Sequence, residues 1–446
     1  MKFSESQIRS LAPDEASMKA GKGLSSKNSW VTIGQNDRVL WGEIKGSGAK
    51  PYQTQIDLLN IAFKCSCPSR KFPCKHGIGL MLVLVSDPNA PTQTDEPSWV
   101  AEWINKRAVK SEQVIVEKTY TEEELSKLEK GKEKRAEERA VAVEDGVAEL
   151  TLWFKDLIKS GLIHLPNKDL SYFNKTSARM IDAKAPGLAS WVKSLSNLNY
   201  ASGNDWQLEA LQIICKTFLL LDAYKNIGQQ IEEMQVTIKN LIGWSQSPKD
   251  LLADDSQPII KDIWLVLGQE EKTNDDIIVQ KTWLLGLHTN EKAMILNFGT
   301  KFSPMPISVM KGSILEAEMV FFPGETRQRA IIKLQNQMFD NVPKLPELLE
   351  DFEQAIDLDR ANIAKNPWWN DTIIVVKNVR LLKNQNQVYA IDSVNNLITI
   401  CPDMLQNIVL NWFVICANGA KITVGFIRNG NFHALGIFKE NNYIVF

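Results

Sequence analysis

Four potential metal ligands crowd into twelve consecutive residues of this 446-residue chain. From Cys65 to His76 the sequence has the pattern C-x-C, a six-residue loop, then C-x-H. Three thiolates and one imidazole are a donor set that zinc accepts in tetrahedral geometry. Because four protein donors leave no coordination position for water, the pattern predicts one structural Zn²⁺ bound by Cys65, Cys67, Cys74 and His76, and disfavours a catalytic metal.

The short spacing between the first two ligands needs a turn. In a straight strand, residues i and i+2 lie on the same face, so a turn after Cys67 would bring both sulfurs to one ion. Pro68 and Pro73 fix the two ends of the loop that follows. Two alternatives stay open: an accidental cluster that binds nothing, and a redox dithiol, although redox pairs usually have the spacing C-x-x-C.

The remaining cysteines and the first residues bear on the compartment. Cys215, Cys401 and Cys416 stand singly among apolar residues, where a thiol is expected to behave as a small buried hydrophobe. The opening sequence MKFSESQIRSLAP lacks the apolar core of a secretory signal. No apolar run approaches the roughly 18 residues that a membrane span needs. We therefore expect a cytoplasmic protein without a membrane segment or a disulfide framework.

The ligand pattern resembles that of the SWIM zinc fingers, in which β-strands precede C-x-C and an aliphatic helix follows C-x-H. Alternating segments at Val39–Ile44 and Tyr52–Leu58, separated by a turn-prone stretch at Lys45–Lys50, match the strands. Gly77–Val85 matches the helix. The one departure is a pair of glycines after the histidine, where such fingers usually carry better helix formers.

The resemblance covers about residues 30 to 90 and supplies all four family ligands. It implies a module that binds DNA or protein, found in stand-alone bacterial proteins, chromatin-remodelling ATPases and Mutator-type transposases. It implies no reaction.

The distribution of charge gives independent evidence on whether the partner is DNA or protein. Residues 1–86 contain 12 Lys or Arg against 6 Asp or Glu, a net charge of +6 in a chain whose total is -2. Four basic residues lie on or between the ligands and are candidate nucleic-acid contacts: Lys64, Arg70, Lys71 and Lys75. A charge of +6 is modest for a domain that binds nucleic acid by charge alone, so a protein partner and DNA are about equally expected.

The rest of the chain divides by pattern. The proline-rich segment Asp87–Pro97 predicts an extended linker, followed by a small docking helix at Ser98–Lys106 and a solvated, charged helix at Thr121–Val143. We expect a multidomain α+β protein with four segments: a small ββα-like zinc finger module (1–90), a linker with the charged helix (91–146), a helical domain (147–256) and a strand-rich antiparallel α+β domain (257–446).

Within the helical domain, one apolar face is formed by Val147, Leu150, Phe154, Leu157 and Ile158, and Gly161 is placed to end that helix. In the last domain, strands are expected at Lys281–Leu287, Ala293–Phe298, Met319–Phe322, Ala330–Leu334, Thr423–Ile427 and Phe432–Ile437, with a helix at Leu348–Ile356. Asn429-Gly430 is the strongest hairpin signal in the chain.

The sequence contains none of the common catalytic motifs that we sought: no phosphate-binding loop, no G-x-S-x-G, no H-E-x-x-H and no G-x-G-x-x-G after a strand. We therefore expect a protein that is not an enzyme. Three hypotheses remain: a zinc-stapled adaptor or scaffold in a protein complex, which we favour, a DNA-binding accessory factor, and an enzyme whose site is assembled from distant residues.

Overall fold

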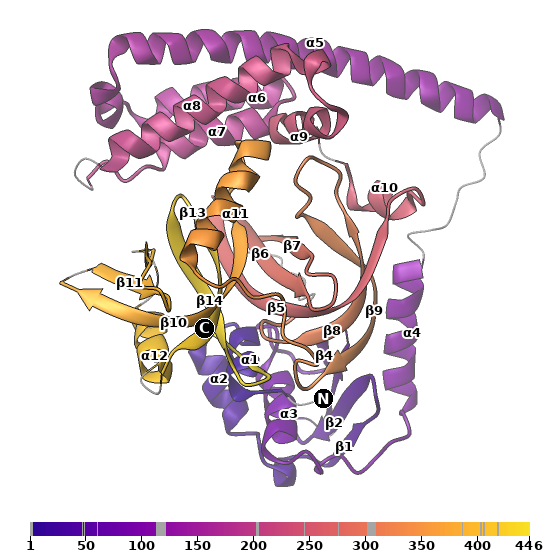
Figure 1. The fold of residues 1–446 in the computed structure, drawn as a ribbon. Coiled ribbons are helices and arrows are strands. Elements are labelled where there is room, and N and C mark those ends of the chain that lie inside the picture. The colour runs from indigo at the N-terminus through magenta and orange to yellow at the C-terminus, as the bar shows by residue number, and fades with distance from the viewer. Residues whose placement is uncertain are drawn as a thin grey trace.

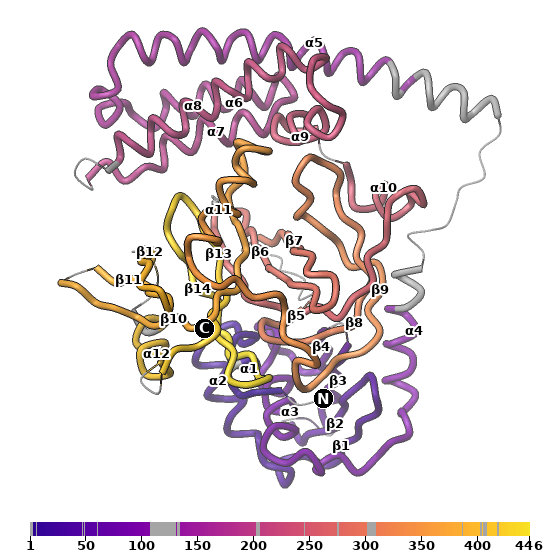
Figure 2. The backbone as a smooth tube through the Cα atoms, viewed as in Figure 1, coloured from indigo at the N-terminus to yellow at the C-terminus, as the bar shows by residue number. Residues whose placement is uncertain are grey.

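The chain folds as a mixed α+β protein, as predicted (Figure 1). The computed structural model describes residues 3–446 except 47, 49, 60, 113–121, 202–204, 245, 275, 301–308, 386, 402–403, 405 and 417–418. An amino-terminal unit and a bundle of helices lie at opposite ends of the molecule, and the carboxy-terminal strands lie between them (Figure 2).

The amino-terminal unit opens with two short helices. α1 (Glu5–Leu11) begins with a capping box between Ser4 and Gln7, and α2 (Glu15–Lys22) begins at Asp14, whose side chain accepts a hydrogen bond from the Ser17 N–H. After a 3-10 turn, η1 (Lys27–Ser29), come four antiparallel strands and a helix: β1 (Thr32–Gln35), β2 (Val39–Ile44), β3 (Tyr52–Asp57), β4 (Ala62–Cys65) and α3 (Lys75–Ser86). The predicted strands and helix are confirmed, and positions 47 and 49 of the expected turn lie outside the described residues.

Both faces of this small sheet are covered. Leu40 and Ile44 of β2 pack in a core with Ile56 of β3 and the apolar residues of α3. Val39 and Trp41 point the opposite way, as alternation along a strand requires, and pack against Val100, Ile104 and their neighbours in α4 (Ser98–Glu112). The docking helix expected at Ser98–Lys106 is therefore confirmed.

The segment before α4 is extended, but it is packed. The Thr92 N–H donates to the Ile33 carbonyl and the Gln35 N–H donates to the Gln93 carbonyl, so the chain runs along the edge of β1. A buried carboxylate also holds α4 against the sheet. The Asp57 carboxylate of β3 lies 3.5 Å from the Arg38 guanidinium and 3.4 Å from that of Arg107 in α4. The docking helix and the sheet are thus tied by apolar contacts and by charge.

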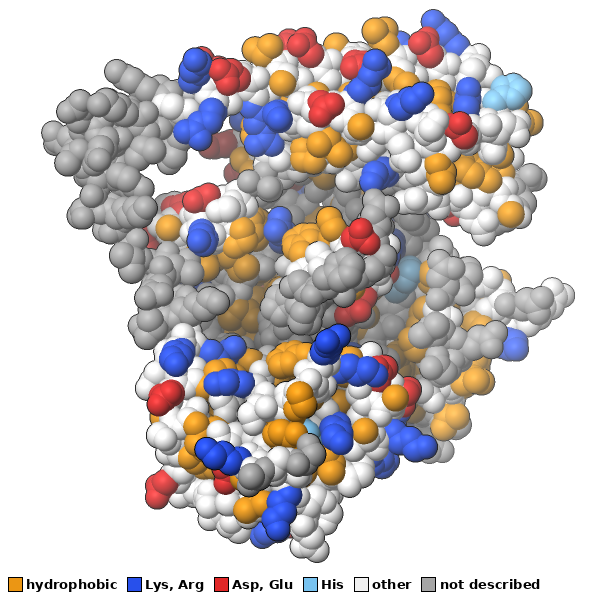
Figure 3. Space-filling model, turned by 180° about the vertical axis from the view of Figure 1, so that it is seen from behind, with side chains coloured by type: hydrophobic (Ala, Val, Ile, Leu, Met, Phe, Trp, Pro, Cys, Tyr) orange, Lys and Arg blue, Asp and Glu red, His pale blue; other side chains and the backbone are white. Residues whose placement is uncertain are grey.

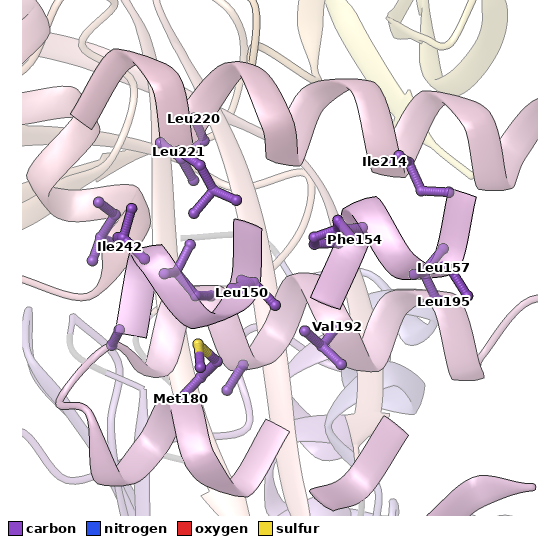
Figure 4. Close-up of a cluster of buried hydrophobic side chains, with 14 of the residues drawn as sticks. Leu150, Phe154, Leu157, Met180, Val192, Leu195, Ile214, Leu220, Leu221 and Ile242 are labelled. Atoms are coloured by element: carbon purple, nitrogen blue, oxygen red, sulfur yellow. The ribbon is translucent and has the colours of Figure 1, made fainter. Parts of the chain in front are cut away.

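The central helices form the expected helical domain and pack together as a bundle. The elements are α5 (Glu122–Ser160), η3 (Leu162–Asn167), α6 (Leu170–Asp182), α7 (Pro186–Ser196), α8 (Asp205–Lys225), η4 (Ile227–Gln229), α9 (Glu232–Ile242) and α10 (Pro248–Ala253). Side chains from five of these helices point toward one another, among them Leu150, Phe154, Met180, Val192, Ile214 and Ile242 (Figure 4). The charged segment and the first helix of the bundle are one element, because α5 passes residue 146 without a break.

One part of the predicted apolar face is wrong. Val147, Leu150, Phe154 and Leu157 are buried, whereas Ile158 is 46% exposed. Ile158 follows Leu157 directly, and a step of one residue turns a side chain by about 100°, which carries it off the buried stripe.

The carboxy-terminal unit is built from two antiparallel sheets. The five-stranded sheet has the order β7 (Lys292–Thr300), β6 (Ile277–Gly286), β5 (Ile259–Asn274), β8 (Ile314–Phe321), β9 (Ala330–Phe339). The six-stranded sheet has the order β12 (Leu397–Thr399), β11 (Gln387–Ile391), β10 (Thr372–Asn384), β13 (Lys421–Arg428), β14 (Asn431–Lys439), β15 (Asn442–Val445). A shared core joins the sheets, with the rings of Trp283 and Phe426 at 4.7 Å.

All six predicted strands of this unit correspond to observed strands, although Leu287 and Phe322 lie one residue past the ends of β6 and β8. The Asn429-Gly430 hairpin is confirmed as well, and both residues have the positive φ that a tight type I′ turn requires. The helix expected at Leu348–Ile356 is shifted: α11 spans Phe352–Lys365 with Asp351 as its N-cap, and Leu349 instead pairs with Val376 of β10. A further helix, α12 (Gln406–Cys416), lies beside β10.

The three parts are joined by specific contacts. Trp368 packs in the core of the bundle and its indole N–H donates to the Lys216 carbonyl of α8 at 2.9 Å. At the other end, Met310 and Met338 pack against the core of the amino-terminal unit, and the Gln335 side chain donates to the Leu59 carbonyl at 2.6 Å. The carboxy-terminal unit therefore holds both ends of the molecule.

The isolated cysteines correct one expectation. Cys215 is exposed and Cys401 and Cys416 are half-buried, so the prediction of three buried thiols is wrong. Cys215 lies on a helix that is apolar on most faces, and neighbouring apolar residues alone did not reveal which face is solvated. Among the helices of the described residues, none combines the length and the apolar character that crossing a membrane requires.

Candidate metal centre

The four predicted ligands come together in space. One donor atom from each of Cys65, Cys67, Cys74 and His76 lies within 4.8 Å of the other three. The Nδ1 atom of His76 is 3.7 Å from Sγ of Cys65 and 3.9 Å from Sγ of Cys74. A tetrahedral zinc with Zn–S of about 2.3 Å and Zn–N of about 2.0 Å separates its donors by roughly 3.5 to 3.8 Å. The site therefore fits one structural zinc ion closed by protein ligands.

A strand end and a helix start place the donors. Cys65 is the last residue of β4, opposite Thr54 of β3, and the next residue is fixed by two hydrogen bonds between Ser66 and Gln53. Cys74 is the N-cap of α3, which puts His76 in the first turn of that helix. Because α3 begins directly after the loop, Cys74 and His76 lie beside Cys65 at the end of β4.

The surroundings of the ligands hold them in place. The Thr54 hydroxyl lies 3.2 Å from Sγ of Cys65, and the Tyr52 ring lies 5.3 Å from the His76 ring. Cys74 and His76 are buried, whereas Cys65 and Cys67 are half-buried. Contacts of this kind around a metal site orient the ligands and limit the access of water.

The surroundings shift the pKa values of the three thiols in different directions. A hydrogen bond with Cys65 lowers the pKa of Cys74, and the His76 ring and the Gly77 backbone N–H act in the same direction. That shared hydrogen bond, together with burial, raises the pKa of Cys65, and burial raises the pKa of Cys67.

The two glycines after the histidine have a packing role. A Cβ on Gly77 would lie 2.8 Å from the Phe63 ring, and a Cβ on Gly79 would lie 2.7 Å from Cβ of Leu24 and 3.1 Å from the Gly21 carbonyl oxygen. The two contacts shorter than 3.0 Å are closer than real Cβ atoms show, and the third is tighter than most. α3 still spans 12 residues, so close packing against β4 and α2 offsets the poor helix propensity of glycine.

The candidate nucleic-acid contacts are all exposed. Lys64, Arg70, Lys71 and Lys75 are solvent-accessible, and basic side chains are visible on the end of the molecule that holds the amino-terminal unit (Figure 3). Lys71 is engaged, however, because its ammonium lies 2.7 Å from the Asp14 carboxylate. A zinc bound by three thiolates carries a net charge of -1, so the basic residues also offset the charge of the site.

Sequence reasoning did not single out Asp14, Tyr52 and Thr54 as neighbours of the ligands. Nothing local in the sequence linked Asp14 to a loop 57 positions later.

Comparison with known families agrees with this geometry. Residues 62–84, from the start of β4 to the last turn of α3, match the SWIM zinc finger. The chain carries a SWIM-type zinc finger. Residues 138–242 match a second family, the SWIM-associated four-helix bundle domain. A search of curated proteins and a search of solved structures found no match to the chain.

The two family matches explain the architecture at both ends of the molecule. The SWIM finger supplies the zinc centre, and the SWIM-associated bundle comprises most of the helical part, from the second half of α5 to the end of α9. Both findings are those expected of a SWIM-type zinc finger protein. Helical periodicity had predicted a helical domain at residues 147–256, without the bundle arrangement and without its link to the finger.

Proposed function

We propose that this SWIM-type protein is an adaptor that joins protein partners, with the zinc serving only to hold the amino-terminal unit in shape. The supporting observation is an apolar stripe on α8. Leu208, Leu211, Cys215 and Leu219 are all exposed and follow one another at intervals of three, four and four residues. Such spacing places them on one face of the helix.

An exposed apolar stripe of this kind can bind a helix of another protein. Side chains three and four residues apart form a ridge that fits the groove of a facing helix, and amphipathic helices bind proteins through such ridges. Exposed apolar residues that are grouped rather than scattered mark interaction surfaces. The proposed partner therefore presents an amphipathic helix to α8.

The test compares two leucine substitutions of matched exposure. Leu211 is 47% exposed on α8, and Leu397 is 49% exposed on β12 in another part of the molecule. Affinity purification under native conditions should recover the same partner with the wild type and with Leu397→Glu, and lose it with Leu211→Glu. Equal recovery with all three proteins would exclude α8 as the contact.

A second candidate function is DNA binding by the exposed basic face of the finger. Of the four basic residues, Lys64, Arg70 and Lys75 have no carboxylate within ion-pair distance among the described residues, so they remain able to meet phosphates. Co-purifying nucleic acid should be analysed in the same experiment, because its presence would favour this candidate.

The proposal includes no catalysis by the zinc centre. Four protein donors leave no position at which a water could be activated. It also places the protein in a reducing compartment such as the cytoplasm, since three thiolates must stay reduced to hold the metal.

A further inference from the structure

A cavity of about 270 Å³ lies where the bundle meets the carboxy-terminal sheets. Its walls come from α9, from β6 and β7, from the loop between β8 and β9, and from the segment 366–371. Figure 1 shows these elements meeting below α9. The cavity belongs to neither the zinc centre nor the apolar stripe on α8.

An arginine without a carboxylate partner lines this cavity. The guanidinium carbon of Arg329 lies 4.1 Å from the centre of the Phe322 ring, so one face of the group is covered. Within the described chain, no carboxylate lies within ion-pair distance of Arg329, and burial alone lowers its pKa. A half-buried cation with no counter-ion is costly unless something else supplies the negative charge.

The one acidic side chain in the wall is already satisfied. The Asp371 carboxylate receives hydrogen bonds from Arg428 at 2.6 and 3.1 Å and lies 3.5 Å from the Lys281 ammonium. Glu270 is likewise held by Arg428 and Lys272. Because these carboxylates are matched by cations, the charge of Arg329 is left to attract an anion.

The remaining walls suit a flat apolar body. Met294 and Trp369 line the cavity, and the indole N–H of Trp369 is satisfied by the Thr372 hydroxyl at 2.7 Å, which leaves the apolar ring surface. Asn370 stands exposed at the same cavity, and no hydrogen bond of its side chain is recorded within the described residues. Small-molecule sites typically combine such apolar walls with a few polar groups.

We propose that this cavity binds a small ligand that carries an oxyanion, either carboxylate or phosphate, on a flat apolar body. Arg329 holds the oxyanion through the N–H edge of its guanidinium, a geometry that matches both groups in bidentate fashion. Trp369 and Met294 contact the apolar body, and Asn370 donates to the ligand from the rim.

Ligand binding also ties the bundle to the sheets. Polar contacts already cross this junction beside the cavity: the Glu325 N–H donates to the Thr237 hydroxyl at 2.9 Å, and the Asn240 amide donates to the Pro323 carbonyl at 3.4 Å. A ligand seated between the same elements binds only when they are assembled. It therefore raises the midpoint of thermal unfolding in proportion to its occupancy.

The experiment titrates the full-length, zinc-loaded protein with benzoate and with phenyl phosphate, using benzamide as the neutral control. Binding is followed by calorimetry and by the melting temperature. The two anions distinguish a carboxylate site from a phosphate site, and benzamide should bind neither tightly nor with a rise in melting temperature. Loss of one charged hydrogen-bond donor in Arg329→Gln should weaken the binding of the preferred anion by roughly 10- to 100-fold.

A neighbouring arginine provides the matched control. Arg327 is exposed on the same loop, so Arg327→Gln removes the same charge and should leave the affinity unchanged. If Arg329→Gln does not fold, Asn370→Ala at the exposed rim replaces it and should weaken binding severalfold. Failure of both anions to bind the wild type, or equal losses in Arg327→Gln and Arg329→Gln, would overturn the proposal without affecting the adaptor function.

Discussion

The Lys71 ammonium lies 2.7 Å from the Asp14 carboxylate, and this pair links the zinc loop to the start of α2. The hydrogen bond from Lys71 lowers the pKa of Asp14 to about 2, and Asp14 also accepts the Ser17 N–H as the cap of its helix. One of the four basic residues around the metal is therefore occupied within the molecule. Lys71 is therefore a structural lysine, whereas Lys64, Arg70 and Lys75 have no ion-pair partner among the residues that the structure describes.

DNA binding can be tested through this difference. If the finger contacts phosphates, the combined substitution of Lys64, Arg70 and Lys75 by Gln should weaken DNA binding and reduce its salt dependence. Each lost phosphate contact lowers the slope of log K against log salt by about 0.9. Lys71→Gln should change the slope little. Fluorescence anisotropy with a short DNA duplex, over a series of salt concentrations, measures the affinity and its salt slope. A wild type that does not bind DNA at low salt would exclude DNA binding as the function.

Loss of a zinc ligand should unfold the amino-terminal unit. Cys67→Ser or His76→Ala removes one of four donors, and metal binding is coupled to folding in small zinc units, with apparent binding free energies of about 10–16 kcal/mol. Zinc content by elemental analysis should fall well below one equivalent. The carboxy-terminal sheets should remain protected in hydrogen exchange, apart from residues near Met310 and Met338, which pack against the lost core.

Cys215→Ser is the control for this prediction. It removes an exposed thiol far in sequence from the ligands and should keep full zinc and an unchanged melting profile. A Cys67→Ser protein that retained stoichiometric zinc would show that the ligand assignment is wrong.

The zinc site was predictable because all its donors lie within twelve residues, and one strand end followed by one helix start suffices to assemble them. The same holds for the Asn429-Gly430 hairpin, whose turn chemistry is local. The cavity was not predictable, since Asn240, Lys281 and Asp371 are separated by tens of residues and meet only when the bundle packs against the carboxy-terminal sheets.

Other errors have a common physical source. The exposed stripe on α8 was hidden because that helix is apolar on most of its surface, so the pattern could not distinguish the buried face from the solvated one. The predicted helix at Leu348–Ile356 began too early because apolar residues precede the cap. Asp351 fixes the true start, and Leu349 is drawn into pairing with β10.

The glycines of α3 give a prediction with an internal control. Gly79→Ala gains up to about 1 kcal/mol in helix propensity but forces Cβ against Leu24 and the Gly21 carbonyl, an overpacking that typically costs about 1–3 kcal/mol. The substitution should therefore destabilise the amino-terminal unit. Among the described residues, the Cβ of Gly131→Ala in α5 would meet the flexible end of the Arg135 side chain at 3.4 Å, so this substitution should stabilise the helix. Denaturant titration measures the free energy of unfolding of both variants. A Gly79→Ala protein as stable as the wild type would contradict the packing argument.

His433 predicts a specific loss of stability in mild acid. Its ring stacks on the Phe426 ring, with the ring centres 4.7 Å apart. Burial is the largest cause that lowers the pKa of His433 to about 4. The charges of Arg428 and Lys272 also lower this pKa, whereas those of Glu270 and Asp371 raise it. An unfolded chain takes up this proton near the ordinary value of about 6.5. The stability that neutral His433 contributes is therefore complete above pH 6.5 and is lost as the pH falls toward 4.

The measurement compares the pH dependence of unfolding in two histidine variants. Between pH 7.5 and 5, the wild type should lose more stability than His433→Gln, whereas His164→Gln, at an exposed position, should follow the wild type. Release of zinc in acid affects all three proteins alike, so the difference between them reports on the half-buried His433 ring. An NMR titration of the His433 ring with a midpoint near 6.5, or identical pH dependence in His433→Gln and the wild type, would show that the ring is not held neutral by burial.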